Sequence, residues 1–118
     1  MKGCAAAIAF IGKTKLVKHD CKSHLVQRYE NGPFSSGTWS SPYGTQKASG
    51  LAGDEHGHLW IHDKLNVMSW ESNRWQVNEL PGQKQPKYIA AGMDEHVYVI
   101  STNDEILRFT TFDWTIVP

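Results

Sequence analysis

The sequence predicts an all-β chain of three four-stranded antiparallel propeller blades, which a homodimer would complete to a six-bladed β-propeller. Short runs of β-branched and aromatic residues alternate with breaks of Asp, Asn and Glu, the pattern of strands and tight turns. A group of four such runs occurs three times, and no stretch keeps the 3.6-residue period of an amphipathic helix. We expect one domain over residues 1–118, with blades at about 1–42, 48–80 and 87–118.

The repeat is clearest between the second and third copies. A shift of 39 residues aligns them without a gap between Gly53 and Val77. The matched positions keep their apolar or aromatic class: Ala52-Gly53 with Ala91-Gly92, Ile61 with Ile100, Val67-Met68 with Ile106-Leu107, Trp70 with Phe109, and Trp75 with Trp114. The first copy aligns through Gly12, Tyr29 and Trp39, if its first turn is two residues shorter and its second two longer. Repeats of this length are typical of propellers and solenoids.

Each copy supplies four predicted strands. They are Ala6–Ile11, Lys15–His19, His24–Tyr29 and Thr38–Ser40 in the first copy, Ser49–Gly53, His58–Asp63, Val67–Trp70 and Trp75–Asn78 in the second, and Tyr88–Gly92, Val97–Thr102, Ile106–Thr110 and Trp114–Val117 in the third. The segments HLWIH and HVYVIS carry bulky apolar residues on both faces, as strands covered on both sides do. We therefore expect the sheets to pack face to face, as propeller blades do.

Closure of the propeller is the reason to expect a dimer. A propeller needs about four to eight blades, and three would leave two apolar faces bare, which is unusual for a soluble monomer. A head-to-tail contact closes into a ring when the rotation fits, so we expect the third copy of one chain to pack against the first copy of another. The alternative is a piece of a longer chain, against which Met1 argues mildly.

Composition narrows the partners and the compartment. The formal net charge is zero, which argues against nucleic acid or an anionic membrane, and no apolar run approaches the ~20 residues of a membrane span. The spacing of Cys4 and Cys21 fits no metal or redox motif, and free buried thiols are expected rather than a disulfide. The start MKGCAAAIAFIG is similar to a short signal peptide, but the repeat assigns it to the first strand. The compartment stays open between the cytoplasm and non-classical secretion.

Several strings resemble the tectonin-type propeller repeat. They are IAAG, VYVIS, ILRF and DWTIV in the third copy, with LAG, LWIH, VMSW and RWQV in the second. The resemblance covers about two-thirds of the chain. It implies a six- or seven-bladed propeller and, as for many members, a lectin for sugars on microbial surfaces. Other members are interaction modules in membrane traffic.

The first copy is similar to a blade of the fucose-binding fungal and bacterial lectins, through LVKHD and HLVQRYENGPFSSGTW. Some of those lectins assemble a six-bladed ring from short chains. The Arg expected on their second strand is absent here, and Lys18 and His19 stand in its place. The resemblance therefore implies the mode of assembly and not the fucose specificity.

Three sets of residues are candidates for a sugar site. The pairs His19-Asp20 and His62-Asp63 both end a second strand, where copy three has Ser101-Thr102, and can hydrogen-bond hydroxyl groups; the alternative is that a blade turn favours Asp. Tyr29, Trp60 and Trp70 can stack on a sugar ring. Arg28 and Arg108 match in position on the third strand, with Ser69 between them in the series, and can donate to hydroxyl or carboxylate groups; the alternative is a blade-to-blade ion pair. Trp39, Trp75 and Trp114 recur once per copy and are expected to pack between blades.

Metal and enzyme sites are not expected. His56, His58 and His62 lie at alternate positions and three histidines can hold zinc, but His56 falls in a turn and no fourth ligand is evident. No cofactor is expected, and no motif predicts catalytic residues. The leading hypothesis is non-catalytic carbohydrate binding at repeated sites between blades, with avidity from weak contacts. The alternative is a protein–protein interaction scaffold that uses one rim, because the fold alone does not determine the function.

Overall fold

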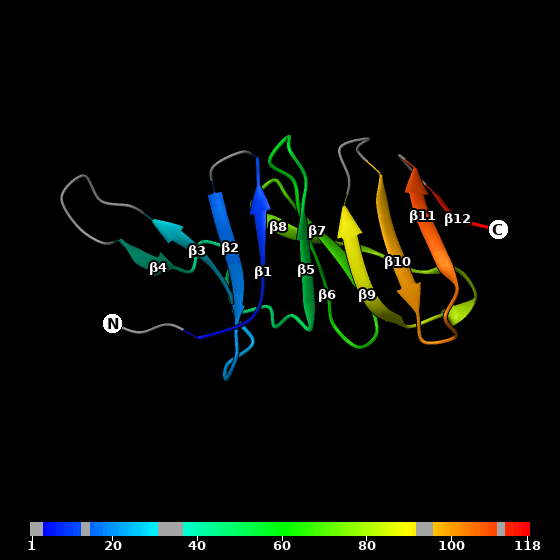
Figure 1. Cartoon of the computed structure of the whole chain (residues 1–118), viewed down its shortest axis with the longest axis horizontal. Coiled ribbons are helices and arrows are strands. Elements are labelled where there is room, and N and C mark those ends of the chain that lie inside the picture. The colour runs from blue at the N-terminus through cyan, green and yellow to red at the C-terminus, as the bar shows by residue number, and fades with distance from the viewer. Residues whose placement is uncertain (1–3, 13–14, 31–36, 92–95, 111–112) are drawn as a thin grey trace.

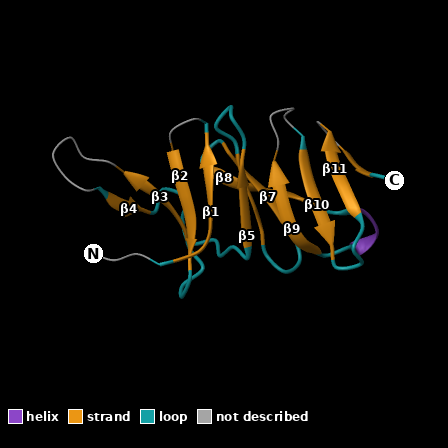
Figure 2. Cartoon of the chain, viewed as in Figure 1, coloured by secondary structure: helices purple, strands orange, loops and turns teal. Residues whose placement is uncertain are grey.

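The computed structural model describes residues 4–12, 15–30, 37–91, 96–110 and 113–118. These residues form three four-stranded antiparallel sheets, in which neighbouring strands follow one another along the chain (Figures 1 and 2). The first sheet contains β1 (Ala5–Ile11), β2 (Lys15–Asp20), β3 (Val26–Glu30) and β4 (Thr38–Ser40). The second contains β5 (Gly50–Gly53), β6 (Leu59–His62), β7 (Val67–Glu71) and β8 (Arg74–Asn78). The third contains β9 (Pro86–Ala91), β10 (Val97–Ser101), β11 (Ile106–Thr110) and β12 (Asp113–Ile116).

The all-β prediction is confirmed, and every predicted strand is present with its ends displaced by at most two residues. Gly92, the predicted end of a strand, lies outside the described residues. The helical part of the described chain is a single short 3-10 turn, Pro81–Gln83, in the linker between the second and third sheets. No helix in the described chain is long and apolar enough to cross a membrane.

The sheets radiate from their first strands. Strands β1, β5 and β9 lie side by side and contact one another in that order. In Figure 1 the first sheet extends to the left of these strands, the third extends to the right, and the second recedes between them. The longest dimension, 49 Å, runs across the first and third sheets. The arrangement therefore has one sheet covered on both faces and two sheets covered on one face each.

Two apolar cores hold the sheets together. The first lies between the first and second sheets and is built from nine buried residues, among them Val17, Val26, Ile61 and Met68. The second lies between the second and third sheets and includes Trp60 and Leu107. All four residues of β6 are buried, so the prediction of cover on both sides is confirmed for LWIH, whereas His58 is exposed. It is wrong within the chain for HVYVIS, because Ile100 is 36% exposed.

Strand registers correct the predicted repeat. The aromatic pairs Tyr29–Trp39, Trp70–Trp75 and Phe109–Trp114 mark the same place in the three sheets. Followed back from there, the registers bring the pairs Phe10–Leu16, Gly53–Leu59 and Ala91–Val97 into correspondence. Gly53 therefore corresponds to Phe10 and Ala91, and its alignment with Gly12 and Gly92 was wrong. The first turn of the first sheet is not shortened.

The second turn explains the error. Its closing hydrogen bonds run from Asp20 to Leu25, from Asp63 to Asn66, and from Ser101 to Glu105. The second turn is thus two residues longer in the first copy than in the second, as predicted, and one residue longer in the third. The shift between the second and third sheets is 38 residues before this turn and 39 after it. The gap-free alignment is therefore right only in its second half, where Trp70–Trp75 corresponds to Phe109–Trp114.

Candidate functional site

A cleft of about 370 Å³ opens between the first and second sheets, beside the turns that follow β1 and β5. Its lining residues are Ile11, Gly12, Lys15, Arg28, Tyr43, Glu55, His56, Gly57, Leu59 and Trp70. Two predicted site residues, Arg28 and Trp70, are brought together here from different sheets. Aromatic, cationic and hydroxyl groups therefore converge on one opening.

Arg28 is fixed by its own strand. Its Nε donates a 2.6 Å hydrogen bond to Oε1 of Glu30, and Ser40 Oγ donates to the same oxygen at 3.2 Å. The hydrogen bond to Arg28 lowers the pKa of Glu30, and the same bond raises the pKa of Arg28. For Arg28, the expectation of an ion pair between blades is wrong. Residues two apart on a strand point to the same face, and the acceptor of Arg28 is Glu30 on its own strand. The guanidinium is therefore held at the wall of the cleft.

Tyr43 is the residue that the sequence analysis missed. It lies in the polar linker between the first two sheets, yet it is only 4% exposed. Its ring packs edge-on against Trp70 with the ring centres 5.3 Å apart, and its carbonyl accepts a 3.0 Å hydrogen bond from Trp75 Nε1. Its buried hydroxyl makes no hydrogen bond of standard geometry within the part of the chain that the structure describes, but the Arg28 guanidinium lies close enough to act on it as a donor. The one signal in the sequence was an aromatic residue within an otherwise polar linker.

The Tyr43 hydroxyl has unused hydrogen-bonding capacity next to a cation. Burial raises the pKa of the phenol, and the nearby Arg28 guanidinium opposes that increase. The O–H of this phenol has no acceptor among the described residues.

Trp70 supplies the aromatic wall of the cleft. It is half-buried on β7 and makes an edge contact with Trp75, with the ring centres 5.0 Å apart. Trp75 is part of the packing between sheets, as predicted, and so is Trp114, which packs against Phe109 in the second core.

A second, smaller cleft of about 310 Å³ lies between the second and third sheets. It is lined by Val77, Asn78, Glu79, Pro81, Phe109, Asp113 and Trp114. By register, Ser69 occupies the position of Arg28, and Leu80 joins Phe109 and Trp114 in the core as Tyr43 joins Trp70 and Trp75. The guanidinium and hydroxyl of the first cleft therefore have no counterparts in the second.

The predicted polar residues at the ends of β2 and β6, away from the first cleft, close turns. Asp20 Oδ2 accepts hydrogen bonds from the Lys22 and Ser23 amides at 3.0 Å, and Asp63 Oδ1 accepts from the Leu65 and Asn66 amides at 2.7 Å. The amide of Ser23, followed by that of Lys22, lowers the pKa of Asp20 to about 2.

The third sheet closes the same turn with Ser101, whose Oγ accepts hydrogen bonds from the Asn103 and Glu105 amides at 3.3 Å. Ser101 therefore corresponds to Asp20 and Asp63, and the predicted match of Asp63 with Thr102 was displaced by one residue.

Two predicted histidines are buried next to these turns. His19 and His62 are 3% and 4% exposed, and His62 Nδ1 donates to the Asp63 carbonyl at 2.9 Å. His19 Nδ1 has no hydrogen-bond partner among the described residues, and its ring stacks 5.8 Å from that of His24. Burial, followed by His24 and His62, lowers the pKa of His19. A pocket of about 510 Å³ lies beside them, and of the four predicted residues at these turns only Asp63 lines it.

The remaining predicted residues lie apart from the first cleft. Trp60 is 9% exposed and packs against Phe109 in the second core, with the ring centres 5.4 Å apart. Tyr29 contacts Trp39 on the first sheet, 5.2 Å between ring centres. Arg108 lies on the third sheet, where its Nε is buried and has no partner within the described ranges.

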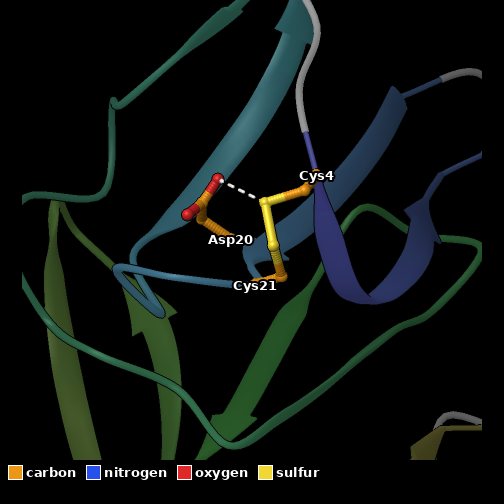
Figure 3. A group of neighbouring side chains, drawn as sticks. All are labelled: Cys4, Asp20 and Cys21. Atoms are coloured by element: carbon orange, nitrogen blue, oxygen red, sulfur yellow. Dashed lines mark hydrogen bonds between the residues drawn. A yellow bond between two sulfur atoms is a disulfide. The ribbon is translucent and has the colours of Figure 1, made fainter.

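The three histidines considered for zinc are not gathered. His58 precedes β6 and its Nδ1 donates to Asp54 Oδ2 at 2.8 Å, whereas His62 ends the same strand. Among the residues that the structure describes, one close group could offer metal ligands: Cys4, Asp20 and Cys21. Both of its sulfur atoms are joined in a disulfide, so neither is available as a thiolate (Figure 3).

The disulfide corrects the expectation that Cys4 and Cys21 are free. Ala5 pairs with Asp20 across the first hairpin, so the residues just outside this pair face each other, with their Cα atoms 5.5 Å apart. Lys18, only 2% exposed, lies beneath: its Nζ donates to the Cys4 carbonyl at 2.7 Å and lies 3.5 Å from Asp20 Oδ1. The same Nζ lies 4.6 Å from the ring centre of Trp39. The disulfide thus fixes an acceptor for a buried lysine.

Neither a protein-family model nor a curated protein matches the sequence. The interpretation of the clefts therefore depends on their own geometry.

Proposed function

We propose that the protein is a non-catalytic carbohydrate-binding protein whose ligand enters the cleft between the first and second sheets. The observation that supports this most is the cleft itself, in which the guanidinium of Arg28 and the aromatic rings of Tyr43 and Trp70 line one opening. A sugar presents hydroxyl groups at its edge and C–H groups on its faces. The cleft offers hydrogen-bonding groups for the first and an aromatic wall for the second.

Each lining residue has a role in this proposal. Trp70 packs against an apolar face of the sugar. The Nε of Arg28 is already committed to Glu30, so its terminal nitrogens donate to sugar hydroxyls. The Tyr43 hydroxyl both donates and accepts, and Glu55 and His56 border the opening.

The proposal includes assembly with a second copy into a six-bladed ring. The first and third sheets each leave one face uncovered. Exposed Ile8 lies on the uncovered face of the first sheet, and exposed Tyr88 lies on that of the third. Several weak clefts in one ring would bind a surface that carries many glycans through avidity.

An interaction scaffold is the second candidate. It is favoured by the same exposed apolar side chains, because uncovered apolar surface often marks a protein-binding site. In that case a different protein, and not a second copy, would cover the faces.

A glycan array with the purified full-length chain tests the proposal. We expect binding to a related set of glycans, competition by the free sugar, and loss of binding in Tyr43→Phe and Trp70→Ala. Leu65→Ala, at an exposed residue outside the cleft, is the matched control. A blank array from folded protein would reject carbohydrate binding, and a single tight protein partner in a pull-down would favour the scaffold.

A further inference from the structure

Strand β10 has apolar side chains on both faces, but only one face packs against another sheet. Its residues Val97, Val99 and Ser101 are buried against the second sheet, whereas Tyr98 is half-buried and Ile100 is 36% exposed. Ile100 pairs with Tyr88 and Ile106, which are 61% and 43% exposed. Cross-strand partners share a face. The third-sheet free face, as we name it, consists of Tyr88, Tyr98, Ile100, Ile106 and Arg108.

The first sheet has an uncovered face too. Ile8 and Phe10 alternate on β1 with residues that face the first core, and they are 59% and 55% exposed. Leu16, the cross-strand partner of Phe10, lies on the same side. The first-sheet free face, as we name it, consists of Ile8, Phe10, Leu16, Tyr29 and Trp39.

The corrected registers identify what these faces match. The third-sheet free face corresponds to the side of the second sheet that packs on the third sheet. In order, its residues correspond to Gly50, Trp60, His62, Val67 and Ser69. The first-sheet free face corresponds to the side of the second sheet that packs on the first sheet. In order, its residues correspond to Leu51, Gly53, Leu59, Trp70 and Trp75.

The two free faces are therefore the two halves of an interface that the chain already makes twice. The first and third sheets extend to opposite sides of the first strands (Figure 1). A two-fold rotation that places the first sheet of a second copy on the third sheet also forms the reverse contact. A two-fold axis leaves neither face uncovered.

We propose that two copies pack through these faces and that each junction forms a composite cleft, with Arg108 from one copy and Tyr29 from the other. These residues stand where Arg28 and Trp70 stand in the cleft within the chain. That the composite cleft takes a sugar rests on the function proposed above. The pairing of the faces does not.

Arg108 supports the composite cleft independently. At the position of Glu30, which holds Arg28, the third sheet has Thr110, and the Arg108 Nε is left buried without an acceptor among the described residues. The terminal nitrogens of Arg108 can donate to the Tyr29 hydroxyl of a second copy or to a ligand. Buried Lys18 pairs with Ile8 and lies beside the first-sheet free face, where it is already bonded to the Cys4 carbonyl and Asp20, so the contact leaves this lysine paired.

Sedimentation equilibrium of the full chain tests the interface. We expect the mass of a dimer for the wild type, and a monomer for Ile100→Lys and for Tyr88→Lys. Leu65→Lys adds the same charge at a residue that is 61% exposed and outside both free faces, and it should remain dimeric. Circular dichroism identifies any variant that fails to fold. A monomeric wild type, or a dimer that survives both charged variants, overturns the interface.

Cross-linking tests the juxtaposition directly. In a mixture of Tyr29→Cys and Arg108→Cys chains, a short bis-maleimide should join two chains, and neither variant alone should be joined. Chains that are not joined, although the mixture is dimeric, would overturn the placement of these residues.

Equilibrium dialysis with methyl glycosides of glucose, galactose, mannose and N-acetylglucosamine tests the site. We expect two bound molecules per chain in the wild type and one in Arg108→Gln, Arg28→Gln and monomeric Ile100→Lys. One molecule per chain in a wild-type dimer would overturn the composite cleft and leave the function proposed above intact. No binding of any glycoside would reject that function while the mass and the cross-link still decide the interface.

Discussion

The Nε of Arg28 donates to Oε1 of Glu30 across 2.6 Å, two residues along the same strand. This bond orients the guanidinium at the cleft, and it leaves only the terminal nitrogens for a ligand. A lysine at this position cannot reproduce either feature, because an ammonium group is a point donor on a flexible stem.

Arg28→Lys should therefore weaken sugar binding although the positive charge is retained. Loss of one hydrogen bond from a charged donor corresponds to about 1.5–3 kcal/mol, or roughly a 10- to 100-fold weaker affinity. Titration with the free sugar that competes best on the array measures it. Glu30→Gln, which keeps the shape but not the charge of the acceptor, should have a smaller effect in the same direction. Equal affinity in Arg28→Lys and the wild type would remove Arg28 from the site.

Tyr43→Phe should weaken sugar binding without destabilising the protein. The hydroxyl makes no hydrogen bond of standard geometry among the described residues, so its removal should leave the free energy of unfolding within about 1 kcal/mol of the wild type. Sugar binding should fall because the ligand loses a hydrogen-bond partner. Urea unfolding and sugar titration of the same samples measure the two effects, with Leu65→Ala, at an exposed residue outside the cleft and both free faces, as the control. A loss of stability together with unchanged binding would show that the hydroxyl has a structural role.

The sequence was sufficient for the strands because their apolar runs and polar breaks are local signals. The run LWIH and its flanking turns predict β6, and all four of its residues are buried. It was not sufficient for the register before the second turn, because turns of different length can be closed by the same residue type. Asp63 closes a turn that ends at Asn66, whereas Ser101 closes one that ends at Glu105.

The candidate site was predicted only in part for a related reason. Arg28 and Trp70 were recognised from their types and strand positions, but residue spacing does not show which side chains meet across two sheets. Tyr43 was missed because it belongs to a linker whose other residues are polar. The disulfide was missed because the spacing of Cys4 and Cys21 resembles no motif, although the predicted first hairpin already brings its two ends together.

His19 should make stability depend on pH. Burial lowers its pKa in the folded chain below the ordinary value of 6.5, so the unfolded chain binds a proton more readily. Its contribution to stability is complete above pH ~6.5 and is lost as the pH falls through that value toward the folded pKa. Urea unfolding at pH 7 and pH 5 should show this loss, and His19→Leu should reduce it. Asp20 does not contribute to the difference between pH 7 and pH 5, because its lowered pKa changes the stability only at pH values below about 3.8. An unchanged pH dependence in His19→Leu would contradict the assignment.

Gly53 should not tolerate a side chain. A Cβ there would overlap the carbonyl oxygen of Phe10 and meet Ile11 Cγ2 at 2.7 Å, where β5 passes β1. Gly53→Ala should therefore lower the free energy of unfolding by about 1–3 kcal/mol, through forced separation of the first two sheets. The corresponding residue of the third sheet, Ala91, already has a Cβ, and Ala91→Gly should cost less, about 0.5–1 kcal/mol. Thermal unfolding of both variants gives the comparison, and a fully stable Gly53→Ala would show that the sheets are not in close contact here.

Reduction of the Cys4–Cys21 disulfide should destabilise the first sheet. The bond closes a loop with a sequence separation of 17 residues, for which chain entropy predicts about 3 kcal/mol. It also positions the Cys4 carbonyl that accepts from buried Lys18, so reduction should remove that hydrogen bond as well. Urea unfolding with and without dithiothreitol measures the change, and a double variant with Cys4→Ser and Cys21→Ser should be insensitive to the reductant. Two titratable thiols in the unreduced, denatured chain would show that the bond is absent and would remove this contribution altogether.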